Sequence, residues 1–273
     1  MAAIDTHAHI IDPARFPYAA DATYHPVGPE IGPVERYLDV LDAHGITHAV
    51  VVQPTSGYRF ENAVTLDAVS RAGGRLRAVV RIDPERAKSD ETLLDQPAVA
   101  GARLDLIGDG LEALQHPGNR RLLHALRERG KVLVVQVERD LLADGLQVLA
   151  DSGVALCIDH CGRPDPGRSL EQRGFQALLE LGRLGHAVKL SGPFRFSQEA
   201  PPFRDALPFI ATILETFTSA QCCWGSDWPY LRAATRLDYG PELRWLASWV
   251  PAEADRHAIL CATPRRVFGF AVA

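Results

Sequence analysis

The sequence lacks the features that mark secreted, membrane-spanning and disulfide-stabilised proteins. Its five cysteines are an odd number and form no Cys-x-x-Cys pair, which favours buried thiols in a reducing cytoplasm over a disulfide framework. The sequence does not open with a basic stretch followed by an apolar segment, so we expect no signal peptide. No apolar run approaches the roughly 20 residues that cross a bilayer, so we expect no membrane partner.

An excess of positive charge is also lacking. The net charge is −5, which gives no electrostatic reason to expect nucleic acid or an anionic membrane as a partner. With 273 residues, 47% of them hydrophobic, the chain can bury a large core. No linker or low-complexity segment divides it, so we expect residues 1–273 to form a single domain. The sequence leaves the oligomeric state open.

Short apolar runs rich in Val, Ile, Leu and Ala recur along the chain. Such runs, with little polar alternation except near their ends, are typical of strands that are covered on both faces. The predicted strands are Ile4–Ile10, His48–Pro54, Leu76–Ile82, Val99–Ile107, Lys131–Val137, Val154–His160, Ala187–Gly192 and Cys222–Asp227.

Helical patterns lie between these runs. The predicted helices are Val34–His44, Asn62–Ala72, Asn119–Arg129, Leu141–Ala150, Phe175–Leu184, Phe203–Phe217 and Ala254–Cys261. Strand and helix in alternation indicate parallel strands joined by crossover helices. The first strand is not followed by the glycine-rich fingerprint of a dinucleotide-binding open sheet, which is the alternative architecture. The pattern therefore predicts an α/β fold, a TIM (β/α)8 barrel.

Four residues at predicted strand ends carry the candidate chemistry. His7 and His9 end the first strand on one face, because side chains alternate along a strand. His160 ends the sixth strand and Asp227 ends the eighth, which neighbours the first in a closed barrel. Active sites of this fold lie at the carboxyl ends of the strands, so we expect these four side chains to converge. Three imidazoles and a carboxylate can bind a metal ion or activate water beside a carbonyl group.

The residues around these positions resemble a known family. The matching segments are Asp5–His9, Asp159–Asp165, Lys189–Gly192, Trp224–Pro229 and Thr263–Phe270. They are similar to the amidohydrolase-related group of the amidohydrolase superfamily, in the branch of 2-pyrone-4,6-dicarboxylate lactonase and sugar-acid lactonases. The resemblance covers nearly the whole chain. It implies a distorted TIM barrel, hydrolysis of a small lactone by a carboxylic-ester hydrolase, and a lactone or carboxylate as the small-molecule partner.

The resemblance leaves the use of metal open. The superfamily takes further ligands from a Lys or Glu on the fourth strand and a His on the fifth. This chain has Arg103 and Asp105 on the fourth strand, and Gln136 and Glu138 on or beside the fifth. A two-metal centre is therefore not expected. One divalent ion, with Zn²⁺ as the first choice, would be held by the four residues His7, His9, His160 and Asp227. The other alternative is a site that needs no metal.

Both alternatives predict the same roles in catalysis. Asp227 would activate water as a general base. The three catalytic histidines, His7, His9 and His160, would polarise the carbonyl directly or through the metal ion. The runner-up function is a metal-dependent decarboxylase or hydratase of the same superfamily. Those enzymes tend to use an additional histidine ligand, which the fifth strand does not supply.

Arginine is the expected side chain for binding a substrate carboxylate, because its guanidinium group binds carboxylates in a bidentate manner. Arg103, Arg163 and Arg195 lie at or just beyond predicted strand ends. The resemblance implies two more substrate contacts, from Tyr24 and Thr55.

Asp105 departs from the family pattern, which often has Asn at this position. It lies two residues from Arg103 and therefore on the same face of the strand. A carboxylate there would partly neutralise Arg103 and favour a hydroxylated or monoanionic lactone. The alternative is a structural contact with a neighbouring loop.

Overall fold

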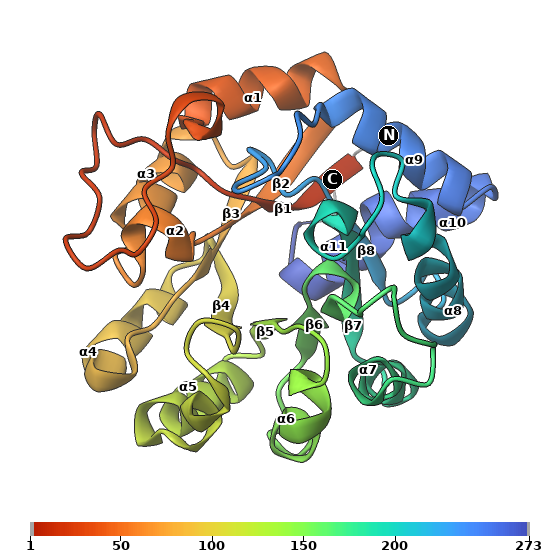
Figure 1. Ribbon diagram of the computed structural model, residues 1–273. Helices are drawn as coiled ribbons and strands as arrows, with labels where there is room; N and C mark the ends of the chain where they lie inside the picture. Colours follow the sequence, from red (N-terminus) through yellow and green to blue (C-terminus); the bar gives the residue numbers. More distant parts are fainter. Residues whose placement is uncertain (1–2, 272–273) are drawn as a thin grey trace.

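The computed structural model describes residues 3–271, in which eight parallel strands form one sheet in sequential order. The strands are β1 (Ala3–Ala8), β2 (Ile46–Val52), β3 (Leu76–Val80), β4 (Val99–Asp105), β5 (Val132–Gln136), β6 (Leu156–Ile158), β7 (Ala187–Ser191) and β8 (Cys222–Gly225). Every predicted strand is present, and helices surround the strands (Figure 1). Because β6 and β8 end earlier than predicted, His160 and Asp227 lie two residues beyond their strands.

The barrel closes between β8 and β1 just beyond the regular ladder. His9 N donates to Trp228 O at 2.8 Å, and Asp227 N donates to His7 O at 2.8 Å. Asp5 reinforces the junction, because its buried carboxylate accepts hydrogen bonds from the backbone N–H and the hydroxyl of Ser226. This irregular closure agrees with the predicted distorted TIM barrel, and it brings the two site-bearing strands together.

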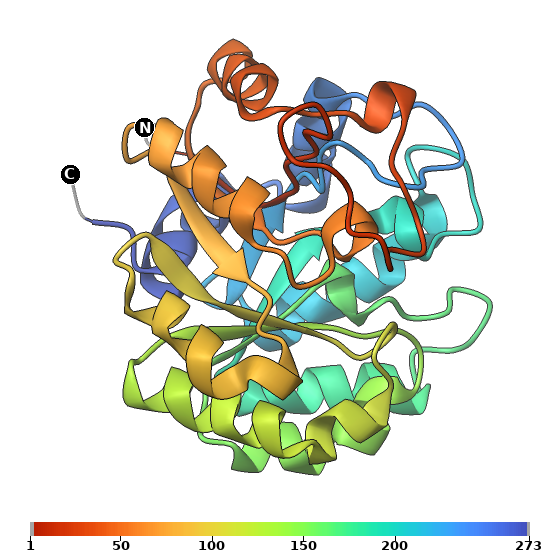
Figure 2. The ribbon, with the colours of Figure 1, turned by 90° about the vertical axis from the view of Figure 1, so that its left-hand side faces the viewer.

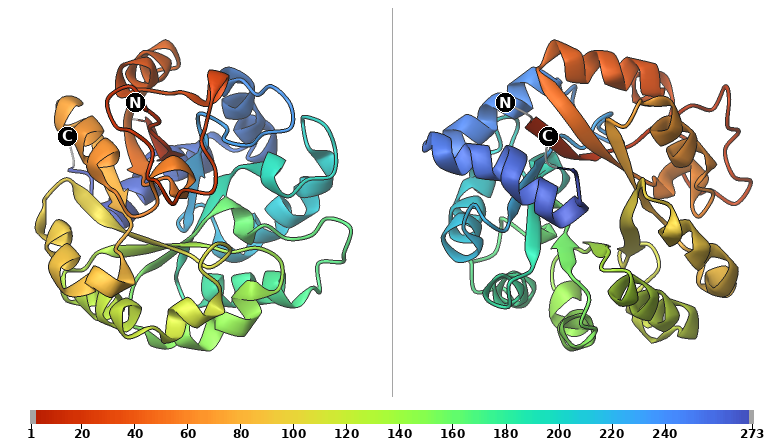
Figure 3. Two further views of the ribbon diagram at one scale, coloured as in Figure 1. Left: turned by 60° about the vertical axis from the view of Figure 1, so that its left-hand side comes forward. Right: turned by 180° about the vertical axis from the view of Figure 1, so that it is seen from behind.

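Helices alternate with the strands around the barrel (Figures 2 and 3). They are α1 (Val34–Ala43), α2 (Thr55–Tyr58), α3 (Ala63–Arg71), α4 (Ala87–Asp90), α5 (Pro117–Glu128), α6 (Leu141–Asp151), α7 (Arg173–Arg183), α8 (Leu207–Phe217), α9 (Tyr239–Trp249), α10 (Glu253–His257) and α11 (Thr263–Phe268). Short 3-10 turns supplement them, and a π-helical turn (Ala258–Ala262) joins α10 to α11.

The sequence pattern missed α9. Gly240 and Pro241 interrupt the helical pattern, but both lie in the first turn of α9, where proline loses no intrahelical hydrogen bond. The helix predicted over Phe203–Phe217 is observed as α8, which begins only at Leu207, because Arg204–Ala206 form a 3-10 turn before it.

The barrel interior is apolar at one end and polar at the other. Small and aliphatic side chains from all eight strands pack with Phe268 and Phe270, at the end of the described chain, in one buried cluster. Further along the same strands, polar side chains point inward, including Lys189 and Ser191 on β7. Phe268 and Phe270 thus form an aromatic floor beneath the polar end, where the site lies.

Within residues 3–271, no helix combines the length and apolar character needed to span a bilayer. All five cysteines are buried and unpaired. The cytoplasmic location stays a prediction.

Candidate active site

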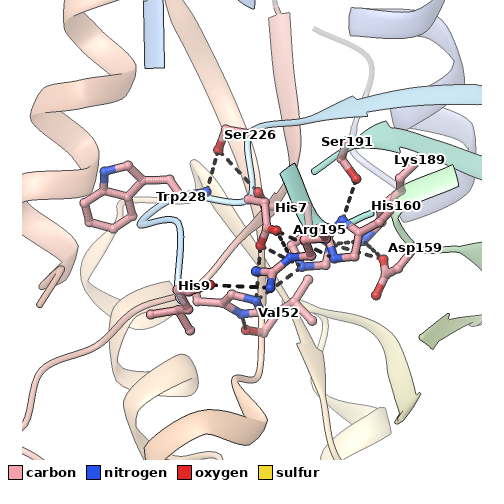
Figure 4. Close-up of polar contacts among 12 residues, drawn as sticks. His7, His9, Val52, Asp159, His160, Lys189, Ser191, Arg195, Ser226 and Trp228 are labelled. Carbon is pink, nitrogen blue, oxygen red and sulfur yellow. Dashed lines mark hydrogen bonds and ion pairs between the residues drawn. The ribbon is translucent and has the colours of Figure 1, made fainter. Parts of the chain in front are cut away.

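His7 and His9 lie next to each other at the carboxyl end of β1, with their Nε2 atoms 3.3 Å apart (Figure 4). The Nδ1 atom of His9 lies 2.8 Å from the carbonyl oxygen of Val52. A carbonyl only accepts, so His9 carries its proton on Nδ1 and presents a lone pair on Nε2. Both rings are buried.

Asp227 faces the two histidines across the barrel junction. Its Oδ1 atom lies 3.6 Å from His9 Nε2 and 3.8 Å from His7 Nε2, is buried, and has no hydrogen-bond partner among the described residues. Its Oδ2 atom accepts a hydrogen bond from Arg195 Nε. Burial raises the pKa of Asp227, but the charge and hydrogen bond of Arg195 outweigh it and hold the pKa well below its ordinary value. Asp227 is therefore a carboxylate at neutral pH.

His160 completes the cluster from the turn after β6. Its Nε2 atom lies 3.8 Å from Asp227 Oδ2, and its Nδ1 atom lies 2.9 Å from the hydroxyl oxygen of Ser191. Gly192 allows this approach, since a Cβ there would meet His160 Nδ1 at 2.7 Å. His160 and Asp227 both have positive φ angles, +51° and +59°, which residues other than glycine rarely adopt. Such strain is concentrated at functional sites.

Burial keeps the three imidazoles neutral. It lowers the pKa of His7 to about 4, with Lys189 as the next cause, and it lowers the pKa values of His9 and His160 well below the ordinary value. Neutral imidazoles can donate one hydrogen bond and accept another, or ligate a metal.

A buried charged group supports His7 from behind. The Nδ1 atom of His7 lies 3.1 Å from Asp159 Oδ1, and Lys189 Nζ lies 3.1 Å from each of these two atoms. Arg103 Nε donates to the other Asp159 oxygen at 3.1 Å. Burial raises the pKa of Asp159, but the positive charges of Lys189 and Arg103 overcome it, so the carboxyl group is ionised. Asp159 and Lys189 belong to the motifs of the resemblance, but sequence reasoning gave them no role.

A cavity of about 250 Å³ opens beside the His/Asp cluster. Its walls include His9 and four arginines, Arg103, Arg163, Arg195 and Arg232, the last of which sequence reasoning missed. The buried Nε of Arg163 has no partner among the described residues. Burial, followed by repulsion from Arg195, lowers the pKa of Arg163 to about 9. Arg163 thus lines the cavity with one of its donors unsatisfied.

Asp105 and Thr55 line the same cavity and contact each other. Thr55 Oγ1 donates to Asp105 Oδ2 at 2.9 Å, and Gly108 N donates to Oδ1 at 3.1 Å. Burial raises the pKa of Asp105, but the positive charges of Arg103 and Arg81 lower it by more. The net pKa is below the ordinary value, so Asp105 is a carboxylate. Its contacts therefore combine a loop anchor with a negative charge in the cavity wall. Gln136 also lines the cavity.

Tyr24 lies apart from this cavity. It lines a larger hollow of about 1100 Å³, where its hydroxyl donates to Glu30 at 2.6 Å and its ring lies under Arg232, 4.2 Å from the guanidinium carbon. The structure therefore does not place Tyr24 in the cavity wall with the other predicted site residues, although Arg232, which covers its ring, lines that cavity. The role of Tyr24 in substrate binding stays a prediction.

The residues that could hold one metal ion are His7, His9 and Asp227, and His7, Asp159 and His160 form a second such group. The first group fits a metal chemically, because Asp227 Oδ1 is buried without a partner and His9 Nε2 carries a lone pair. A Lys or Glu bridging two metals is absent from β4 (Val99–Asp105), where Arg103 pairs with Asp159 instead.

Comparisons with known proteins identify the family of this chain. The family model described as amidohydrolase matches residues 4–270. The 4-sulfomuconolactone hydrolase of Rhizobium radiobacter is 33% identical over 273 residues, covering 97% of this chain and 89% of that protein. The D-galactarolactone isomerase of Agrobacterium fabrum is 27% identical, covering 97% and 90%.

A crystal structure of a probable 2-pyrone-4,6-dicarboxylic acid hydrolase from Acinetobacter baumannii, with citric acid bound, superimposes with a TM-score of 0.88. It is 27% identical, and the match covers 99% of this chain and 100% of that one. The resemblance read from the motifs is thus confirmed over their whole span. This chain belongs to the amidohydrolase family.

Proposed function

We propose that this enzyme hydrolyses the ring ester of a small lactone that carries a carboxylate or sulfonate group. The observation that carries the proposal is the unpartnered Asp227 Oδ1, which lies among the histidines beside a cavity walled by arginines. The related lactone hydrolase and lactone isomerase support the same substrate class.

Asp227 is the proposed general base. Its Oδ1 and the lone pair of His9 Nε2, 3.6 Å apart, are both acceptors. A water molecule held by them donates both of its protons and turns its own lone pair outward, toward a bound carbonyl carbon. As the water oxygen attacks, its proton passes to Asp227. When the ring C–O bond breaks, the departing oxygen takes that proton, and the product is a hydroxy acid.

The N–H groups of His7 and His160 are the proposed donors to the developing oxyanion. Both rings are buried and neutral, and preorganised donors in a site without bulk water stabilise charge strongly. A divalent ion held by His7, His9 and Asp227 would supply Lewis-acid polarisation of the same carbonyl.

Arginines are proposed to set the substrate class. Arg163 offers a buried Nε–H without a partner, and Arg195 reaches both Asp227 and the cavity. A carboxylate or sulfonate on the lactone would satisfy these donors. Asp105 limits the net positive charge, so a monoanionic or hydroxylated lactone fits the cavity better than a dianionic one.

The test is a lactone panel with purified enzyme. It contains a neutral sugar lactone, muconolactone, 4-sulfomuconolactone and 2-pyrone-4,6-dicarboxylate, assayed by acid release with a pH indicator and by NMR of the products. We expect ring opening of the anionic members, with a higher kcat/KM for the monoanionic muconolactone than for the two dianionic lactones. Carbon dioxide release would identify a decarboxylase. An isomeric lactone formed without net hydrolysis would identify an isomerase. If no lactone is consumed, the proposal fails.

A further inference from the structure

Lys189 occupies an unusual position for a buried lysine. Its Nζ lies 3.1 Å from Asp159 Oδ1 and 3.1 Å from His7 Nδ1, and all three side chains are inaccessible to solvent (Figure 4). Pairing with Asp159 explains why a charged lysine is tolerated there. The contact with His7 needs a further explanation, because an ammonium group can only donate a hydrogen bond.

The hydrogen bonds of the neighbouring histidine decide which form of His7 is present without metal. His9 commits its Nδ1 proton to Val52 O, so its Nε2 can only accept. The 3.3 Å contact between the two Nε2 atoms is then a hydrogen bond only if His7 carries its proton on Nε2. His7 Nδ1 is consequently a lone pair, which is the acceptor that Lys189 requires.

Metal ligation demands the opposite tautomer. If His7 Nε2 binds a metal, the proton of the neutral ring moves to Nδ1 and is donated to Asp159, which lies 3.1 Å away. That proton also faces the Lys189 ammonium, which repels it and loses an acceptor. Asp159 thus favours the metal-binding tautomer, and Lys189 opposes it.

We propose that Lys189 is a positioning residue that holds the proton of His7 on Nε2 and thereby weakens zinc binding. In the free enzyme this proton is donated to His9 Nε2. When the attacking water takes that acceptor beside bound substrate, the His7 N–H donates to the substrate carbonyl instead, which shifts the enzyme toward metal-free catalysis. The donor role rests on the proposed function. The tautomer and the zinc affinity do not, because both are measured without substrate.

The first test is the tautomer of His7 in chelator-treated wild-type enzyme. Two-bond ¹H–¹⁵N NMR distinguishes the two neutral forms, and His7→Asn assigns the signal. We expect Nε2–H for His7 and Nδ1–H for His9. A His7 signal with the proton on Nδ1 overturns the proposal, whatever any variant does.

The second test removes the charge with Lys189→Met, which keeps the length of the side chain. Asp159 then becomes the stronger neighbour, so we expect His7 to shift toward the Nδ1–H form. Zinc affinity, measured by competition with a chromogenic chelator, should rise at least about 10-fold, the scale on which groups beside metal ligands act. Unchanged or weaker zinc binding by the folded Lys189→Met variant overturns the proposal.

Arg103→Met is the matched control. Arg103 contacts the other oxygen of Asp159, so this change removes one positive charge from the same carboxylate without altering the Lys189 contact with His7. We expect His7 to stay predominantly Nε2–H in this variant. An equal shift in both variants would mean that total charge, and not Lys189, controls the tautomer. If Lys189→Met does not fold, as judged by circular dichroism, the wild-type spectrum alone decides.

Discussion

The two oxygens of Asp227 have different surroundings, although they belong to one carboxylate. Oδ2 is neutralised by Arg195, whereas Oδ1 is buried beside His7 and His9 without a partner. Leaving a buried acceptor unsatisfied costs on the order of 1–3 kcal/mol, so the fold maintains Oδ1 at a cost in stability. A water proton or a metal ion is what such an atom is able to bind.

Asp227→Asn is the most direct test of this atom. The amide keeps the size of the side chain but is not a base, so we expect kcat for lactone hydrolysis to fall at least about 100-fold. The thermal unfolding temperature should fall modestly, because Arg195 loses its ion-pair partner while the amide oxygen can still accept its hydrogen bond. A variant that hydrolyses lactones at nearly the wild-type rate would refute the assigned base.

Arg163→Met tests anion recognition. The unpaired guanidinium nitrogen should bind the substrate anion before and during the reaction, so KM for an anionic lactone should rise about 10-fold with a smaller change in kcat. KM for a neutral lactone should not rise. Arg168→Met, at an exposed arginine paired with Asp140, is the control and should leave both constants unchanged.

Asp105→Asn tests the charge balance of the cavity. Asparagine can still accept from Thr55, but it no longer neutralises Arg103. We expect the ratio of kcat/KM for 2-pyrone-4,6-dicarboxylate over a neutral sugar lactone to increase. A constant ratio would mean that Asp105 acts only as an anchor for the loop at Gly108.

At the level of elements, the junction of β1 and β8 determines the site. Gly225 packs so closely on β1 that a Cβ there would lie 2.7 Å from His7 Cβ and 3.0 Å from His7 N. The two strands can therefore approach, and Asp227 can face His7, only because residue 225 has no side chain.

Gly225→Ala should force β8 away from β1. We expect a loss of about 1–3 kcal/mol in unfolding free energy, as in other overpacked cores, together with a severe loss of turnover. Gly74→Ala, at a positive φ with open space around it, should also destabilise the protein but leave turnover intact. Chemical denaturation and lactone assays of both variants separate strain from misplacement of His7.

The parts of the structure that could be predicted are those that correspond to a regular pattern along the sequence. Strands covered on both faces are continuous apolar runs, and a barrel collects their carboxyl ends, so the neighbourhood of His7, His9, His160 and Asp227 could be predicted. The pairing of Asp159 with Lys189 could not. It depends on the β6–β7 register, in which Cys157 pairs with Ala187, so that Asp159 and Lys189 lie level two residues later. No periodicity encodes that register.

Long connections gave the poorest predictions for a related reason. The path of the connection between β1 and α1 is determined by contacts such as Tyr18 stacked on His25, with ring centroids 4.9 Å apart. No regular sequence pattern predicts such contacts. The path of this loop carries Tyr24 to Glu30 and away from the cavity. It also lets Arg232, from the loop after β8, cover Tyr24 and line the cavity instead.

On the scale of the whole molecule, we propose that residues 1–273 unfold as one domain, since the site is built from the strands of one sheet and the loops that follow them. Acid should destabilise it. His7 has a pKa of about 4 when folded and 6.5 as an ordinary histidine, so between these pH values the unfolded chain binds a proton that the folded protein does not.

Unfolding free energy should therefore fall as the pH falls from about 6.5 to 4. His7 alone contributes up to about 3 kcal/mol of this loss, at roughly 1.4 kcal/mol per pKa unit. Urea denaturation at a series of pH values should show a single transition whose midpoint declines over this range. In His7→Asn the decline should be shallower. Stability that rises on acidification in this window would contradict a neutral, buried His7.

The aromatic floor has a consequence for protein engineering. The ring centroid of Phe268 lies 5.4 Å from the Lys189 ammonium nitrogen, and Phe268 belongs to the apolar cluster of the barrel and not to the cavity wall. Mutant libraries for altered activity usually randomise the loops at the mouth of a barrel. Here, resizing one ring at position 268 would change how tightly Lys189 is held against His7, so the base of the barrel is a second place from which to tune the catalyst.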